Sequence, residues 1–279
     1  MSIEITNLVV RYGGQAAVDG LSLLVPEGSL FGLLGPNGAG KSSTIRCVAT
    51  TQTPTSGTIS VGGIDALARA AETRSLLGVV PQGIALYEAL DVVQNLQLFG
   101  GLYGLQGNAL STRVEWGLDL AQLSSHSRKT VSSLSGGMKR RLNIACALLH
   151  DPKYLILDEP TTGVDPQSRN HIFETVKKLS SEGRTIVYTT HYMEEVEALC
   201  DRVAIMDRGK LVACDSLTSL LSTGEASAYR VELGESMPED EVRRRLSAAG
   251  IPLKAVSGER KSLEDVFLAT TGRALRDAE

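Results

Sequence analysis

The sequence predicts an α/β fold in which helices cover a mostly parallel β-sheet. Short apolar segments with the character of strands alternate along the chain with longer segments whose apolar residues recur at helical spacing. This alternation is typical of parallel sheets built with helical crossovers. In addition, a glycine-rich loop joins a strand segment to a helix segment near residue 40, and such a junction commonly binds phosphate in α/β folds.

The composition fits a folded protein with one large domain or two unequal ones. The chain has 279 residues, of which 42% are hydrophobic and 22% are charged. That apolar fraction can build a core, so wholesale disorder is excluded. The formal net charge of −4 does not favour an acidic polyanion as partner, and we expect no nucleic-acid binding.

Neither a secretory leader nor a membrane span is expected. The first five residues lack the basic-then-apolar pattern of a signal peptide, and the longest apolar runs are only a few residues. The four cysteines stand at 47, 146, 200 and 214 without a C-x-x-C pair. We therefore expect free, mostly buried thiols in a reducing cytosol, and any work at a membrane to be that of a peripheral partner.

The pattern predicts the following elements in order. Strands are expected at 3–10, 21–25, 30–34, 78–81, 154–157, 185–189 and 202–206. Helices are expected from Lys41 onward and at 89–102, 109–123, 138–149, 167–181 and 193–200. Because only helical patterns occur between about 84 and 150, this stretch is interpreted as a helical subdomain inserted into the α/β domain.

A small polar stretch at 222–228 marks a predicted domain boundary. Residues 1–222 would form the main domain and residues 223–279 a C-terminal appendage. The appendage is expected to contain a strand at 229–233, a helix opened by a capping box at 236–239, and a last helix from Ser262. Three acid-to-base pairs at i,i+4 within 239–245 indicate a solvated helix face.

The glycine-rich loop matches the phosphate-binding pattern G-x-x-x-x-G-K-[ST] in full between Gly35 and Ser42. Its small residues let backbone N–H groups converge on phosphate oxygens, and the following helix adds its positive end. Lys41 is expected to reach the β- and γ-phosphates, and Ser42 to ligate Mg²⁺. The expected phosphate contacts are Gly35, Asn37, Gly38, Ala39, Gly40, Lys41, Ser42, Ser43 and Thr44.

Two carboxylates follow the apolar strand segment at 154–157. In P-loop enzymes, an aspartate at such a strand end holds the metal, which makes Asp158 the Walker B candidate. Neighbouring strand residues point to opposite sides, so Glu159 can share a site with Asp158 only where the strand has ended between them. We interpret Glu159 as the base that orients water.

With these motifs in place, the sequence resembles the ATP-binding-cassette (ABC) ATPases over residues 3–217. Leu134–Met138 is similar to the family's signature peptide, and Gln82 in Val-Pro-Gln is similar to its Q-loop. The D-loop, the switch histidine and the adenine-stacking aromatic correspond to Gly163–Asp165, His191 and Tyr12. Six motifs occur in the family's order.

The resemblance implies a P-loop NTPase (ABC cassette) with an antiparallel β portion, a helical subdomain and a small C-terminal α/β appendage. It implies ATP and Mg²⁺ as cofactors, with Ser42, Gln82 and Asp158 near the metal, and Glu159, His191 and Gln82 as catalytic residues. It further implies that two protomers close over two ATP molecules. The nucleotide contacts that would cross between them are Ser135, Gly136, Gly137 and Asp165.

Two features indicate a subgroup. Met138 replaces the signature's common glutamine, and the run from Ser135 to Leu142 resembles the ATPases of drug, lipid and saccharide exporters. The segment 263–268, followed by Thr-Gly-Arg at 271–273, resembles the C-terminal appendix of drug-resistance export ATPases. The implied function is ATP binding and hydrolysis that drive export.

The implied assembly is two such chains, as a homodimer, under a separately encoded membrane permease at the cytoplasmic face of the cell membrane. Apolar residues between 82 and 105, namely Leu86, Tyr87, Leu90 and Leu102, suit either a docking groove for the permease or the core. Three alternatives are an importer ATPase, a soluble ABC protein of translation or DNA repair, and a non-catalytic nucleotide module. The signature and tail argue against the first. The single P-loop without heptads argues against the second, and Glu159 with His191 against the third.

Overall fold

The computed structural model describes residues 2–222 and 239–249. The strands are β1 (Ile3–Tyr12), β2 (Gln15–Val25), β3 (Leu30–Leu34), β4 (Ser56–Val61), β5 (Ile64–Asp65), β6 (Leu77–Val80), β7 (Tyr154–Asp158), β8 (Thr185–Thr190), β9 (Arg202–Asp207) and β10 (Lys210–Ser216). The helices are α1 (Lys41–Val48), α2 (Ala70–Leu76), α3 (Val92–Leu102), α4 (Gly107–Ala121), α5 (Gly136–Ala147), α6 (Pro166–Ser181), α7 (Met193–Leu199), α8 (Leu217–Ser222) and α9 (Glu239–Ala248), with short 3-10 turns at Ser124–His126 and Val131–Ser133.

Two sheets form the main body. One is antiparallel, with strand order β2-β1-β4-β5. The other has the strand order β10-β9-β3-β8-β7-β6. Adjacent strands in this sheet are parallel, except for the antiparallel pair β10–β9 at one edge. The expected mostly parallel sheet and antiparallel portion are both confirmed, and the fold is α/β.

Alternation along the buried strands divides the core between the two faces of the six-stranded sheet. Along β3, Phe31 and Leu33 join the core that also holds β1, β2, β4 and α1. Leu30 and Leu34 point to the opposite face, into the core with α6 and α7. Because successive strand residues face opposite sides, a strand covered on both faces must be apolar throughout, as β3 is.

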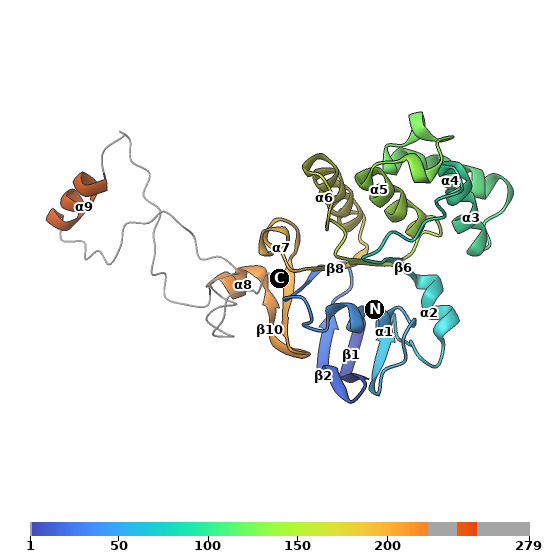
Figure 1. Ribbon diagram of the computed structural model, residues 1–279. Helices are drawn as coiled ribbons and strands as arrows, with labels where there is room; N and C mark the ends of the chain where they lie inside the picture. Colours follow the sequence, from blue (N-terminus) through green and yellow to red (C-terminus); the bar gives the residue numbers. More distant parts are fainter. Residues whose placement is uncertain (1, 223–238, 250–279) are drawn as a thin grey trace.

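The helices α3, α4 and α5 pack on one another around a core of their own. Figure 1 shows these helices together with α6 on one side of the parallel sheet, while β1, β2 and α1 lie on the other side. The all-helical run between α3 and α5 matches the expected helical texture. The boundaries at 84, 150 and 222 stay predictions.

Within the predicted appendage, the structure describes α9. Within it Glu241 pairs with Arg244 and, at 2.8 Å, with Arg245. The Glu241–Arg245 contact is one of the three expected i,i+4 pairs. The strand expected at 229–233 and the helix expected from Ser262 lie outside the described residues.

Neither 2–222 nor 239–249 contains a helix long and apolar enough to cross a bilayer. The cysteines are free thiols, buried at Cys47, Cys146 and Cys200 and exposed at Cys214. Burial raises the pKa of Cys47 to about 11, so this thiol is protonated and unreactive at neutral pH.

Candidate functional site

The parallel strands bring the predicted site residues together at one edge of the sheet. The P-loop follows β3, Gln82 follows β6, Asp158 and Glu159 stand at the end of β7, and His191 follows β8. Because parallel strands end at the same edge, residues from four distant segments meet there.

The P-loop depends on glycine at positions where the backbone packs closely. Gly40 precedes α1 with φ +103, and a Cβ there would lie 2.5 Å from the carbonyl oxygen of Ala17. A Cβ on Gly35 would collide with the carbonyl oxygen of Met206. These contacts hold the loop against β2 and β9 and leave its amides at the start of α1 for an anion.

Lys41 is buried within this loop. Its Nζ donates to the carbonyl oxygens of Gly35 at 2.7 Å and Pro36 at 3.1 Å, and it lies 3.3 Å from Oε1 of Glu159. Burial lowers the pKa of Lys41, and the nearby Glu159 and Asp158 carboxylates oppose that shift. A buried ammonium with carbonyl and carboxylate partners is well placed to transfer to phosphate oxygens.

Asp158 ends β7 beside Ser42. Its Oδ1 accepts hydrogen bonds from Thr189 at 2.6 Å and from Ser42 at 3.3 Å. The Thr189 contact follows from the strand register, since Asp158 lies opposite Thr189 in the parallel β7–β8 pair. The carboxylate is thereby fixed in orientation next to the first residues of α1.

Glu159 points into the same site because β7 ends at Asp158. The backbone of Glu159 is left-handed, with φ +46. Its N–H donates to Thr189, at 3.1 Å to the carbonyl oxygen and 3.0 Å to Oγ1. The condition under which two adjacent carboxylates can serve one site is therefore met.

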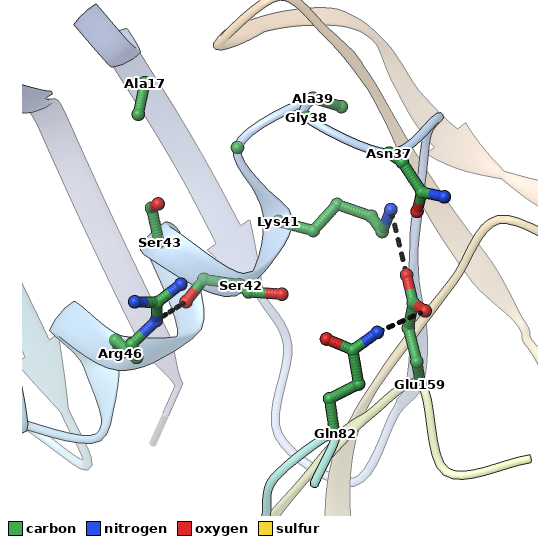
Figure 2. Close-up of a pocket in the computed structure, with 11 residues that line it drawn as sticks. Ala17, Asn37, Gly38, Ala39, Lys41, Ser42, Ser43, Arg46, Gln82 and Glu159 are labelled. Carbon is green, nitrogen blue, oxygen red and sulfur yellow. Dashed lines mark hydrogen bonds and ion pairs between the residues drawn. The ribbon is translucent and has the colours of Figure 1, made fainter. Parts of the chain in front are cut away.

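Three further segments meet the Glu159 carboxylate. Gln82 donates to Oε2 at 3.1 Å, Thr162 donates to the same oxygen at 3.3 Å, and His191 Nδ1 lies 3.4 Å from Oε1. Figure 2 shows Lys41 and Gln82 both reaching toward Glu159. The Glu159 carboxylate is buried, and polar or charged groups surround both of its oxygens.

A cavity of about 400 Å³ opens over the P-loop (Figure 2). Its lining is mostly polar and consists of Ala17, Asn37, Gly38, Ala39, Gly40, Lys41, Ser42, Ser43, Arg46, Gln82 and Glu159. Most of the expected phosphate contacts therefore line the same cavity. Gly35 and Thr44 do not line it. Both the N–H and the hydroxyl of Thr44 bond to the Gly40 carbonyl oxygen, at 2.9 and 3.0 Å.

Tyr12 lies beside this cavity at the end of β1. Its hydroxyl donates to Gln52 at 2.6 Å and lies 3.3 Å from the hydroxyl of Ser43, which lines the cavity. The side chain is 46% exposed. An exposed ring next to a phosphate site can stack on a nucleotide base.

The signature peptide and the D-loop form a second cluster that does not line the cavity. Ser135 caps α5, with its Oγ accepting from the N–H of Met138 at 3.3 Å. Asp165 caps α6 and accepts from the N–H of Ser168 at 2.9 Å, and the hydrogen bonds from Ser168 lower the pKa of Asp165. Two helix N-termini thus lie side by side.

Close packing joins these two helix starts. A Cβ on Gly137 would collide with Oγ of Ser168 and would lie 2.6 Å from Oδ2 of Asp165. A Cβ on the neighbouring Gly136 would meet open space instead. Met138, the unusual residue of the signature, packs against the helical core of α3–α5.

Comparison with known proteins assigns the family. The ABC transporter family model matches residues 18–162, slightly more than half of the chain. The chain belongs to the ABC transporter family. The expected ATPase fold is confirmed, and the chain is an ATP-binding, ATP-hydrolysing cassette of that family.

Among curated proteins, the chain is 39% identical to the linearmycin resistance ATP-binding protein LnrL of Bacillus subtilis (strain 168), over 99% of this chain and 100% of the relative. It is 40% identical to the Nod factor export ATP-binding protein I of Sinorhizobium fredii (strain NBRC 101917 / NGR234), over 99% of this chain and 88% of the relative.

Two solved structures share the fold. An ATP-binding subunit of an ABC transporter aligns with a TM-score of 0.76 at 25% identity, covering 97% of this chain and 100% of the other. A bacterial ABC transporter cassette solved as a dimer aligns with a TM-score of 0.71 at 25% identity, covering 77% and 98% of the two chains.

Several residues of this ABC cassette were missed at the sequence level. Ala17 and Arg46 line the cavity, and Thr189 holds both Asp158 and the Glu159 backbone. Thr189 directly precedes the Thr190–His191 pair, and that neighbourhood was the available signal. Ala17 and Arg46 carry no comparable signal.

Arg140, in the signature helix, was also missed. It is buried and donates to the carbonyl oxygen of Pro81 at 2.8 Å and to that of Gln82. Burial lowers the pKa of Arg140. This arginine ties α5 to the loop that carries Gln82, a contact across more than fifty residues that no local pattern indicates.

Proposed function

We propose that the chain is the ATPase subunit of an ABC exporter, acting as a homodimer beneath a separately encoded membrane permease at the cytoplasmic face of the membrane. The export role is supported by relatives that match over nearly the whole chain and are named for Nod factor export and linearmycin resistance. Dimer formation is supported by the similar cassette solved as a dimer.

The observation that carries dimer-dependent catalysis is the separation of two anion-binding ends. The P-loop lines the cavity, whereas Ser135, Gly136 and Gly137 do not. A helix N-terminus capped at Ser135 can bind phosphate. We assign it to the nucleotide held by the partner protomer, so that closure of the dimer completes each site.

ATP binds with its phosphates over the P-loop. Backbone groups from Asn37 to Gly40 and the start of α1 surround the β-phosphate, while Lys41 moves from the Gly35 and Pro36 carbonyls onto phosphate oxygens. Ser43 and Thr44 extend the helix start, and Tyr12 stacks on the adenine. Asp165 lies beside the signature peptide, and we expect it at the same interface between the two protomers.

Magnesium fits the oxygens next to the P-loop. Ser42 Oγ and Asp158 Oδ1 lie 3.3 Å apart, and Gln82 reaches the same cavity. Mg²⁺ prefers oxygen ligands and retains waters, so two or three protein oxygens suffice beside a triphosphate. When bound, the ion neutralises charge on the phosphate oxygens.

Glu159 is the general base. Its carboxylate orients the attacking water and accepts its proton, while the water oxygen bonds to the γ-phosphorus and the ADP oxygen leaves. Gln82 and His191 contact the same carboxylate and hold it toward the phosphate. When Lys41 engages phosphate, it releases Glu159 from their ion pair.

The permease would contact the surface between residues 82 and 105. Tyr87 and Leu102 are 54% and 69% exposed there, which suits docking. Leu86 instead packs against the helical core. This stretch therefore contributes residues both to the proposed docking surface and to the core.

Co-expression with the membrane protein encoded beside this chain's gene tests the export role. We expect the chain to sediment with membranes and to co-purify with that permease, and to remain in the supernatant when expressed without it. A Leu102→Glu variant should weaken this association but keep ATP hydrolysis. A chain that never associates with the permease would contradict the exporter assignment.

A further inference from the structure

Glu195 is a buried carboxylate that the proposed mechanism does not use. It lies on α7 with 1% of its surface exposed. The side chain of Glu194, its neighbour on the helix, is 86% exposed. A buried carboxylate requires compensation by donors or cations.

Each oxygen of Glu195 contacts a different part of the site. Oε1 accepts from the Thr161 hydroxyl at 2.7 Å and lies 3.2 Å from Nε of Arg169. Oε2 accepts from Thr190 at 2.8 Å and from Tyr188 at 3.0 Å. The three hydroxyls donate hydrogen bonds to the carboxylate, and Arg169 adds a positive charge beside it.

The two pairs of partners belong to two catalytic segments. Thr161 lies two residues after Glu159, and Arg169 lies in α6, whose cap is Asp165. Tyr188 and Thr190 end β8 directly before His191. One carboxylate therefore joins the segment with the base and D-loop to the segment with the switch histidine.

The chemistry of this contact favours one relative placement of the two segments. If either segment shifts, the buried Glu195 carboxylate loses hydroxyl donors that no water replaces. Burial and the adjacent Glu195 raise the pKa of Tyr188, so its hydroxyl stays a donor at neutral pH.

We propose that Glu195 is a positioning residue for ATP hydrolysis, which fixes the Glu159 segment and the His191 segment relative to each other through Thr161 and Thr190. The proposal rests on the roles given to Glu159 and His191 under the proposed function. Glu195 itself does not line the cavity over the P-loop, so it acts through these side chains.

The test measures kcat and KM for ATP in full-length Glu195→Gln, with Glu194→Gln as the matched control. Glutamine keeps the size but replaces one acceptor oxygen with an NH2 donor, so one of the two segments loses its charge-assisted hydrogen bonds to this side chain. We expect kcat to fall by about tenfold or more, with KM changed less than about threefold. Glu194→Gln, which changes the same charge beside the same Arg169, should keep the wild-type kcat.

A second pair of variants, at Thr161, tests the same connection even if Glu195→Gln does not fold. Thr161→Val removes the hydroxyl that meets Oε1 and should lower kcat, whereas Thr161→Ser retains the hydroxyl and should restore it. Because both changes break one connection, the Glu195→Gln/Thr161→Val double variant should be no slower than Glu195→Gln alone. Thermal unfolding of each variant separates lost positioning from lost folding.

The results that would overturn the proposal are distinct. Wild-type kcat in Glu195→Gln, or fully additive losses in the double variant, would refute the positioning role alone. Equal losses for Thr161→Val and Thr161→Ser would show that the hydroxyl is not the connection. A wild-type chain without ATP turnover would instead refute the proposed function and this inference with it.

Discussion

Glu159 shows how one residue's backbone can determine the chemistry of the site. With φ at +46, it leaves the strand direction and places its carboxylate beside Lys41, Gln82 and His191. A non-glycine residue in this conformation costs on the order of 1–3 kcal/mol. The hydrogen bonds of its N–H to Thr189 and the contacts to its carboxylate offset that cost.

Lys41→Ala should weaken ATP binding and abolish most turnover. The change removes a charge-assisted contact to phosphate worth about 1.5–3 kcal/mol, roughly a 10- to 150-fold change in affinity. It also leaves Glu159 without its cation. Isothermal titration with ATP and a phosphate-release assay measure the two effects.

The matched control for that experiment is Lys177→Ala, an exposed lysine on α6. It should bind and hydrolyse ATP as the wild type does. Near wild-type binding and hydrolysis in Lys41→Ala would show that the P-loop assignment is wrong.

Residues whose role is local were predictable from the sequence, and residues whose role depends on the fold were not. The P-loop and the Asp158–Glu159 pair are contiguous patterns, and the structure brings both to one sheet edge. Glu195 lies in the run Met-Glu-Glu-Val-Glu at 193–197, which has the look of a solvated acidic helix. Its burial arises with long-range contacts to Thr161 and Arg169, which no local pattern contains.

At the scale of elements, the fully buried strands were predictable, whereas two of the partly exposed ones, β4 and β10, were not. β3, β7 and β8 are buried at every position, and their continuous apolar or β-branched runs are clear in the sequence. β4 and β10 alternate with polar residues, and β10 is an edge strand with mostly half-buried positions. Such strands depend on their neighbours rather than on composition.

Gly137→Ala should destabilise the contact between α5 and α6. A methyl group at this position collides with Ser168 and comes close to Asp165, and overpacking of this kind costs about 1–3 kcal/mol. Denaturant unfolding should show a lower free energy of unfolding. Gly136→Ala, where the same methyl group meets open space, should leave stability unchanged or slightly raised because alanine favours the helix.

The comparison between these two glycines tests the packing of the signature peptide directly. Equal free energies of unfolding for the two alanine variants would contradict the packing of Gly137 against the start of α6.

At the scale of the whole molecule, two sheets and a helical bundle place the P-loop and the signature peptide in separate clusters. Lys41 and Glu159 line the cavity, whereas Ser135 and Asp165 lie with the starts of α5 and α6. The two candidate anion-binding ends therefore do not line the same cavity of this chain. The dimer closure that we propose would bring the two ends together on one nucleotide.

The predicted appendage at 223–279 is expected to fasten the assembly without contacting phosphate, since the six nucleotide motifs end by His191. We favour the twin protomer as its partner. A chain ending after Leu221 should bind ATP with wild-type affinity, because it retains every expected phosphate contact, and should dimerise less well. Titration calorimetry and sedimentation measure the two properties. Loss of ATP binding in a truncated chain that stays folded by circular dichroism would place the appendage in the site.

The most direct test of the central claim is the mass of Glu159→Gln in solution with Mg-ATP, measured by light scattering during size exclusion. The amide retains the shape of the side chain but cannot accept the water's proton, so ATP should bind and remain unhydrolysed. We expect a shift from monomer to dimer mass with ATP and none with ADP. A variant that stays monomeric with saturating ATP, or that hydrolyses it at the wild-type rate, would contradict catalysis by a base within a closing dimer.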